Sequence, residues 1–211
     1  MKFSPSKESI LKKIRQALSH STPIPFPQSE GNQPVFPPSK QDLEVEFAEQ
    51  FNALQGRFIF CVNLQELAFQ FGSLVKKRDW QKIYCVEEKL KQLAGHSIEE
   101  RFMSTDLAGC NASVTGCECL VARTGSIVMS AAQPSGRTTS VYAPVHICIA
   151  FTSQLVYDVK DALVLLKEKY NNKLPSLITF ATGPSRTADI EKTLVVGVHG
   201  PGEVYCFLVD A

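Results

Sequence analysis

Residues 177–211 read LITFATGPSRTADIEKTLVVGVHGPGEVYCFLVDA, a series of apolar segments separated by glycine-rich turns. Three apolar runs rich in β-branched and aromatic residues are expected to be strands: 177–181, 193–198 and 204–209. Between the second and the third, His199-Gly200-Pro201-Gly202 predicts a turn, because Gly and Pro interrupt regular structure. This part of the chain therefore predicts three short strands, two of which are joined by a tight turn.

The segment between the first two strands, Thr182 to Asp189, reads TGPSRTAD and is the strongest candidate ligand site. We expect the strand to end at Gly183 and a short helix to begin at Ser185–Thr187. A helix start presents free backbone N–H groups, and hydroxyls and the Arg186 guanidinium stand beside them here, which suits a carboxylate or phosphate. Arg186 would dominate, because a charge-assisted hydrogen bond contributes about 1.5–3 kcal/mol. An ordinary turn in which Arg186 pairs with Asp189 explains the same residues equally well.

A second informative stretch, residues 112–130, reads ASVTGCECLVARTGSIVMS. Gly125 separates two apolar runs and allows either a tight turn or a close approach of the backbone to a ligand. Together with TGPSRTADIE and LVVGVHGPGE, this stretch resembles the lactate-utilisation protein C family, whose members contain a LUD domain. Weaker similarity extends over residues 58–209. Family members commonly have an acidic residue at the position of Arg123, so this chain departs from the pattern there.

The resemblance implies an α/β fold with a largely parallel sheet flanked by helices, similar to the sugar-phosphate isomerase, CoA-transferase and formyltetrahydrofolate cyclo-ligase group. It also implies a role in L-lactate utilisation, in which a complex of three proteins oxidises lactate to pyruvate. The iron–sulfur clusters of that system belong to the partner proteins. This chain is then a non-cluster subunit without an intrinsic cofactor, and it binds a small anionic ligand at residues 182–189.

Two other interpretations stay open. The chain is an accessory or regulatory protein of the lactate system without ligand chemistry, or it is a stand-alone enzyme. In the second case the substrate would be a phosphorylated, CoA-type or folate-type compound, which is an analogy from fold alone. Whether the chain has catalytic activity of its own is not decided by these residues.

The overall composition limits the class of protein. The chain has 211 residues, of which 44% are hydrophobic and 20% charged, and its formal net charge is +1. Without a block of like charge, nothing indicates nucleic acid or an anionic membrane surface as a partner. No apolar run approaches the roughly 20 residues that cross a bilayer, and the charged N-terminal sequence is not a secretory signal. We therefore expect a cytoplasmic protein with reduced cysteines.

Changes in composition divide the chain into three parts. Residues 1–19 predict an amphipathic helix that begins at Ser4-Pro5. Residues 20–41 hold six of the twelve prolines and predict an extended linker. Residues 42–211 alternate between the two kinds of regular structure: strands at 57–62, 82–86 and 145–151, and helices at 64–75, 87–94 and 155–170. Such alternation predicts a largely parallel sheet that is covered on both faces.

Cysteine spacing bears on a metal or iron–sulfur site. Cys110, Cys117 and Cys119 have the spacing C-x6-C-x-C. It matches neither the C-x2-C pairs of zinc sites nor the C-x2-C-x2-C run of iron–sulfur clusters. The other four cysteines lie in apolar, strand-like runs, where cysteine behaves as a small hydrophobe. We therefore expect no metal ligands in this chain.

The candidate ligand-binding residues stand next to the expected strands. Histidines at strand ends recur in the sites of α/β proteins, although a lone one is more often structural. Ser126 and Ser185 lack a G-x-S-x-G context, which excludes a nucleophile elbow, and no residue is assigned a catalytic role. The polar segment 131–142 is a candidate loop over the site. The full candidate set is Thr124, Gly125, Ser126, His146, Gly183, Ser185, Arg186, Thr187, Asp189 and His199.

Overall fold

The computed structural model describes residues 5–19, 36–190 and 193–210. The chain divides between Pro38 and Ser39 into two units. In the first unit, the helix α1 (Pro5–Leu18) exposes the apolar side chains of Ile10, Ile14 and Leu18. The other described helices and strands all belong to the second unit, an α/β domain. Among the described residues, no helix has both the length and the apolar character that crossing a bilayer requires.

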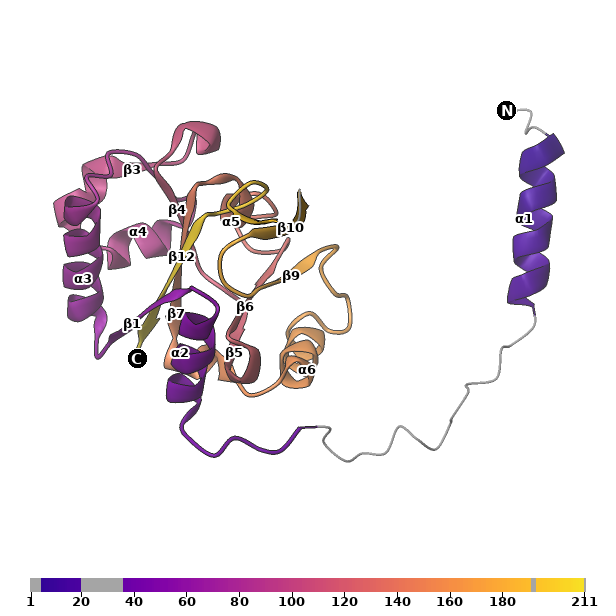
Figure 1. Cartoon of the computed structure of the whole chain (residues 1–211), viewed down its shortest axis with the longest axis horizontal. Helices are drawn as coiled ribbons and strands as arrows, with labels where there is room; N and C mark the ends of the chain where they lie inside the picture. The colour runs from indigo at the N-terminus through magenta and orange to yellow at the C-terminus, as the bar shows by residue number, and fades with distance from the viewer. Residues whose placement is uncertain (1–4, 20–35, 191–192, 211) are drawn as a thin grey trace. The chain divides into compact units, whose positions relative to one another are not determined.

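Six parallel strands form the central sheet of the α/β domain, in the order β1-β12-β7-β4-β2-β3. They are β1 (Arg57–Cys61), β2 (Ile83–Tyr84), β3 (Phe102–Met103), β4 (Ala112–Thr115), β7 (Val145–Phe151) and β12 (Glu203–Val209). The two longest strands, β7 and β12, are neighbours and pair along all seven residues. The sheet confirms the largely parallel α/β architecture expected from the sequence (Figure 1).

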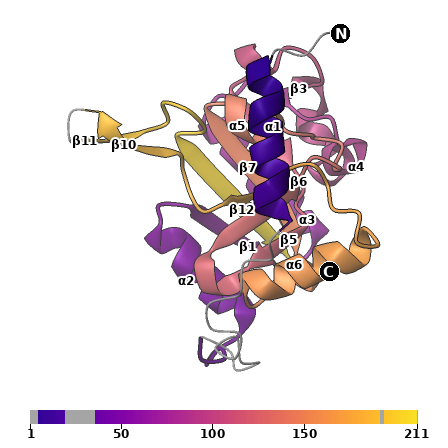
Figure 2. The same ribbon diagram turned by 90° about the vertical axis from the view of Figure 1, so that its right-hand side faces the viewer.

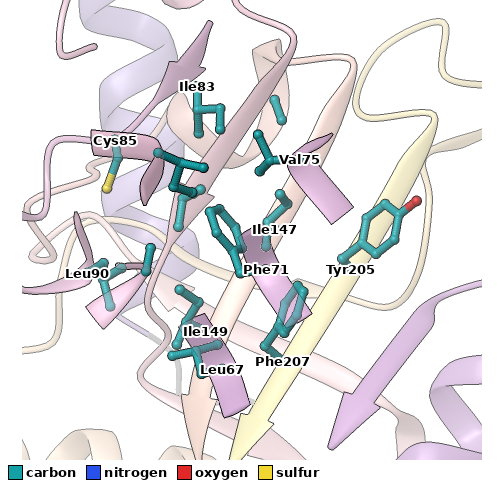
Figure 3. Packing of buried hydrophobic residues seen from close by; sticks show 14 of the residues in the cluster. Leu67, Phe71, Val75, Ile83, Cys85, Leu90, Ile147, Ile149, Tyr205 and Phe207 are labelled. Atoms are coloured by element: carbon teal, nitrogen blue, oxygen red, sulfur yellow. The ribbon is translucent and has the colours of Figure 1, made fainter. Parts of the chain in front are cut away.

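One face of this sheet is covered by α3 (Leu64–Lys77), α4 (Glu88–Leu93) and the 3-10 helix η1 (His96–Arg101). Leu67, Phe71 and Val75 recur every four residues along α3, so they share one side of the helix and are fully buried. Figure 3 shows this core from close by, and the sheet residues labelled in it include Ile147, Ile149 and Phe207. The apolar face of α3 therefore packs on this side of the sheet and buries its side chains.

A second, four-stranded sheet covers the opposite face. Its order is β8-β5-β6-β9, and its strands are β5 (Cys119–Val121), β6 (Ser126–Ser130), β8 (Leu155–Val156) and β9 (Ile178–Ala181). The helix α2 (Leu43–Ala53) contributes Phe47 and Phe51 to the core between the two sheets. The helix α6 (Val159–Lys169) packs on the outer side of the second sheet. The domain is therefore layered: helices, parallel sheet, mixed sheet, helix.

The buried carboxylate of Glu118 joins α6 to the second sheet. It accepts hydrogen bonds from Ser130 Oγ at 2.5 Å and from the Tyr170 hydroxyl at 2.7 Å, and it pairs with Lys169 Nζ at 2.7 Å. Burial raises the pKa of Glu118, but the hydrogen bonds from these three side chains outweigh that effect and hold the pKa below its usual value. The carboxylate is therefore charged and fully partnered inside the domain.

The segment after Ser185 differs from the sequence prediction. The prediction that a helix begins at Ser185–Thr187 is wrong, because Arg186–Ile190 forms the strand β10. β10 pairs antiparallel with β11 (Thr193–Val196), and Figure 2 shows this hairpin projecting from the domain. The β-branched residues of both segments favour strand over helix. The anion site that a helix start would have provided is therefore absent from this part of the described chain.

Smaller differences lie around residues 131–170. The helix expected from Leu155 begins only at Val159, because Asp158 Oδ1 accepts a hydrogen bond from the Val159 N–H at 2.5 Å and caps α6 there. The segment 131–142 ends in a short helix, α5 (Thr139–Tyr142). The remaining 3-10 turns are η2 (Leu107–Gly109), η3 (Ala122–Thr124) and η4 (Thr152–Gln154). Sequence periodicity thus misplaces the boundaries where side chains cap the ends.

Candidate functional site

A cavity of about 240 Å³ lies at the amino-terminal ends of β7 and β12. His146 and Val204, each the second residue of its strand, are register partners and both line it. The other lining residues come from β6, α5, β9 and the loops that follow β9 and precede β12: Met129, Ser140, Val141, Thr179, Ala181, Thr182, Gly183, Pro184, Ser185 and Pro201. Segments far apart in the sequence therefore meet at this edge of the parallel sheet.

Backbone hydrogen bonds fix the two loops of the cavity against each other. The Ser185 N–H donates to the Pro201 carbonyl at 2.9 Å, and the Gly197 N–H donates to the Ser185 carbonyl at 2.9 Å. Gly183 has φ +79°, and a Cβ there would lie 2.5 Å from the Leu54 carbonyl oxygen. Only glycine fits both the left-handed backbone and this close approach. The conformation of the segment Thr182-Gly183-Pro184-Ser185 is thus fixed by the close contact with Leu54 and by the hydrogen bonds of Ser185.

His146 is the titratable residue of the cavity wall. It is 1% exposed, and its Nε2 lies 2.8 Å from Thr115 Oγ1. Burial lowers the pKa of His146 to about 4, so the imidazole is neutral at physiological pH. A neutral imidazole can donate one hydrogen bond and accept another. With Nε2 engaged by Thr115, Nδ1 is the nitrogen left to bond a ligand.

A short chain of hydroxyls leads from the cavity into the second sheet. Thr182 lines the cavity, its Oγ1 lies 2.7 Å from Ser126 Oγ, and Ser126 Oγ lies 2.8 Å from Thr124 Oγ1. Each hydroxyl can donate to one neighbour and accept from another. A hydrogen bond made by Thr182 to a ligand would therefore reorient the donors of Ser126 and Thr124.

The structure brings only some of the ten candidate residues together. His146, Gly183 and Ser185 line the cavity, and Ser126 and Thr124 reach it through Thr182. Thr187 and the exposed His199 are not among its lining residues. The side chain of Asp189 lies outside the described residues, so its pairing with Arg186 stays a prediction.

Two other candidates, Arg186 and Gly125, have structural partners of their own, and so does Arg123, where the sequence departs from the family pattern. Arg186 is exposed, and its guanidinium donates a hydrogen bond to the Leu54 carbonyl, the C-cap residue of α2. Arg123 pairs with Asp158 at 2.8 Å. Gly125 has φ +59°, and a Cβ there would lie 2.6 Å from the Phe51 backbone nitrogen of α2. These residues hold elements of the domain together, and none of them lines the cavity.

The sequence did not point to Ser140 and Thr179 as cavity residues, and it named Thr182 only as the first residue of the candidate segment 182–189. Thr182 carried a signal, because it precedes Gly183 at a strand end. Ser140 lies in the polar segment expected to cover a site, and it reaches the cavity through α5. Thr179 carried none, since nothing in the sequence shows which face of β9 lines the cavity. The cavity is closed by the second sheet, which the sequence did not predict.

The described lining offers hydrogen bonds without formal charge. No residue of the cavity wall is Asp, Glu, Lys or Arg, while Ser140, Thr179, Thr182 and Ser185 supply hydroxyls. Within the described ranges there is also no group of three or more His, Cys, Asp or Glu residues placed to hold a metal ion. Such a wall suits a small polar molecule that is recognised by hydroxyls, backbone groups and a neutral imidazole.

The similarity to a known protein family lies within the α/β domain. Residues 46–209 match the model of the LUD domain. Lactate utilization protein C of Bacillus licheniformis is 36% identical over 102 residues, which cover 47% of this chain and 42% of that protein. An uncharacterized protein of Neisseria meningitidis is 35% identical over 94 residues, covering 44% and 40%. The chain thus spans about two fifths of the length of these curated relatives.

The fold also has a counterpart among solved structures. The crystal structure of a DUF162 family protein from Deinococcus radiodurans superposes with a TM-score of 0.60 at 18% identity, covering 82% of this chain and 99% of that one. This similarity concerns the fold alone. The LUD domain model, in contrast, matches from within α2 to the last residue of β12. The chain belongs to the LUD domain family.

Proposed function

We propose that this protein takes part in L-lactate utilisation as a non-cluster subunit that binds a small organic anion of the lactate type. The family and the name of its relatives in Bacillus support the metabolic role. The observation that supports the ligand is the cavity around His146, whose volume of about 240 Å³ suits a molecule of few atoms. The site is therefore this cavity rather than the Arg186 guanidinium, which is bonded to the Leu54 carbonyl.

A hydroxy acid matches the donors and acceptors of the wall. Thr182 and Ser185 offer hydroxyl donors to a carboxylate, and in this proposal the His146 nitrogen that is not bonded to Thr115 binds the alcohol or keto oxygen. A carboxylate without a cationic partner is costly to bury. Lactate binding should therefore raise the pKa of His146 and take up a proton. The protonated imidazole of His146 then supplies the positive charge that balances the carboxylate of the ligand.

In the oxidation of lactate to pyruvate, two electrons and two protons leave the alcohol carbon and its hydroxyl. In this proposal iron–sulfur proteins are the partners that accept the electrons, and this chain holds the organic acid. Purification of the protein at native expression levels should then bring iron and sulfide with it through those partners. Recovery of the protein alone from such cells, without iron, would contradict membership of the complex.

The ligand proposal is tested by titration calorimetry with L-lactate. Thr182→Val and Ser185→Ala each remove one hydrogen bond to the charged carboxylate, so each should weaken binding about ten- to a hundredfold. His199→Ala is the matched control, because His199 is exposed and lies outside the cavity wall. Affinity should fall as the pH rises, by up to about tenfold per pH unit when one proton is taken up. Absence of lactate binding, or an equal loss in the control, would refute the site.

A further inference from the structure

A second concave site lies between α3 and the edge strand β1, with a volume of about 420 Å³. It shares no lining residue with the cavity around His146. Three cations line it: Arg57 at the start of β1, Lys77 at the end of α3, and Arg78 directly after it. Its apolar lining includes Ile59, Leu74 and Phe207, and the polar residues Gln70 and Ser73 add to its wall. We call this site the α3–β1 groove.

The groove has more positive than negative charge. Glu203 is the carboxylate next to it: its Oε2 lies 3.0 Å from Arg57 Nη2, and its Oε1 pairs with Arg78. Burial raises the pKa of Glu203, but the bond to Arg78 and the charges of both arginines outweigh it, so the carboxyl is ionised. Within the described ranges, Lys77 has no carboxylate at ion-pair distance. One carboxylate among three cations leaves an excess of two positive charges.

Tyr205 keeps Arg57 at the groove. The Arg57 Nη1 donates to the Tyr205 hydroxyl at 3.1 Å, and its guanidinium stands 5.2 Å from the centre of that ring. Figure 3 shows the Tyr205 hydroxyl pointing away from the apolar core, so the aromatic ring bridges the core and the charged rim. An arginine held in this way loses little further conformational freedom when it binds a ligand.

Basic residues at the end of a helix often do no more than interact with the helix dipole. Lys76 and Lys77 both stand in the last turn of α3 and serve that purpose equally. Only Lys77 lines the groove, and there it is joined by Arg57, which comes from a different element. The convergence of cations from β1 and α3 on an apolar concave surface is therefore not explained by the dipole.

We propose that the α3–β1 groove binds an organic phosphate, with the phosphate between Lys77, Arg57 and Arg78 and an apolar part along Ile59 and Leu74. A phosphate monoester carries a charge of about −1.5 to −2 at pH 7, which matches the excess of two positive charges. Arginine forks and a lysine are the usual protein ligands of such a group. The proposal is independent of lactate binding, since the two sites have no residue in common.

Hexyl phosphate is the probe, titrated into the full-length protein by calorimetry. It should bind more tightly than inorganic phosphate, because the hexyl chain covers the apolar lining. It should also bind more tightly than the monoanion hexyl sulfate. Lys77→Gln should weaken binding about ten- to a hundredfold through the loss of one charge-assisted contact. Lys76→Gln, its exposed neighbour outside the groove, should change affinity less than about twofold, and neither change should alter the melting temperature.

Three results would overturn the proposal. Equal losses in Lys76→Gln and Lys77→Gln would show that only the general field of the helix end matters. Equal affinities for hexyl phosphate, hexyl sulfate and inorganic phosphate would show nonspecific ion binding. Binding of a polyglutamate peptide without any binding of hexyl phosphate would assign the groove to an acidic protein segment instead.

Discussion

His146 is neutral in the folded protein because its ring is enclosed between the two sheets. Its folded pKa is about 4, and its ordinary pKa is 6.5. Between these values the unfolded chain binds more protons, so the free energy of unfolding rises with pH. The contribution of the neutral ring is complete above pH 6.5 and is lost as the pH falls towards 4. A difference of about 2 kcal/mol should therefore build up between pH 5 and pH 7.

Urea unfolding at several pH values between 5 and 7 measures this dependence. His146→Gln keeps a hydrogen-bonding group but cannot titrate, so its unfolding free energy should be nearly flat over this range. His199→Gln is the control and should keep the slope of the original protein, because His199 is exposed. The window lies above the usual pKa of the carboxyl groups, so Glu118, Asp158 and Glu203 contribute little to it. A slope that persists in His146→Gln would show that another group is responsible.

Between elements, two glycines allow the cost of a left-handed backbone to be measured apart from the cost of a close contact with a neighbouring helix. Gly125 and Gly136 have similar φ values, +59° and +64°, but only Gly125 lies against α2. A Cβ at Gly136 would meet no atom within 4 Å. Gly136→Ala should therefore cost about 1–2 kcal/mol, from the left-handed backbone alone. Gly125→Ala should cost clearly more, because α2 must also move away from η3.

Chemical denaturation of both alanine variants measures the difference. Loss of α2 packing should also expose Phe47 and Phe51, which are fully buried in the original protein, and near-UV circular dichroism reports their environment. If the two variants lose the same stability, then η3 adapts to the added methyl group and the contact with α2 is not tight.

Much of the parallel sheet could be predicted because its strands are short apolar runs between helices of clear periodicity. The second sheet could not, since β8 has only two residues, Leu155 and Val156, and these also fit the helical pattern of α6. The hairpin β10–β11 was hidden by Gly183-Pro184-Ser185, which resembles a helix start. Its register is decided by pairing with β11, a contact that local sequence does not encode.

The candidate site could be predicted from the sequence only where its residues are neighbours along the chain. Gly183 and Ser185 were found because the loop after β9 is distinctive in sequence. His146 was named as a candidate, but its partner Thr115 belongs to a different strand and became apparent only with the strand order. Arg186 was expected either to bind a ligand or to pair with Asp189, and its hydrogen bond to the Leu54 carbonyl, 132 positions away, depends on a tertiary contact that the local sequence does not show.

For the whole molecule, the two units suggest that the α/β domain folds without the first thirty-eight residues. Among the residues that the structure describes, the clusters that form its core lie from Leu43 onward. A fragment beginning at Ser39 should therefore melt within about 2 °C of the full-length protein and show the same cooperative transition, because it keeps the described core clusters of the domain. Calorimetry of both proteins makes the comparison. A much lower melting temperature of the fragment would show that the first unit stabilises the domain and that the boundary is misplaced.

The position of β12 between β1 and β7 has a consequence for synthesis in the cell. Arg57 of β1 pairs with Tyr205 of β12, 148 positions later in the chain. At roughly 5–20 residues per second, a ribosome needs about 7 to 30 s to cover that distance. Throughout that time β1 lacks its neighbouring strand β12, and the aromatic side chains of α2 lack the β12 residues against which they pack. The protein should therefore depend on a ribosome-associated chaperone, and a ribosome stalled shortly before residue 203 should hold a chain that proteases still degrade.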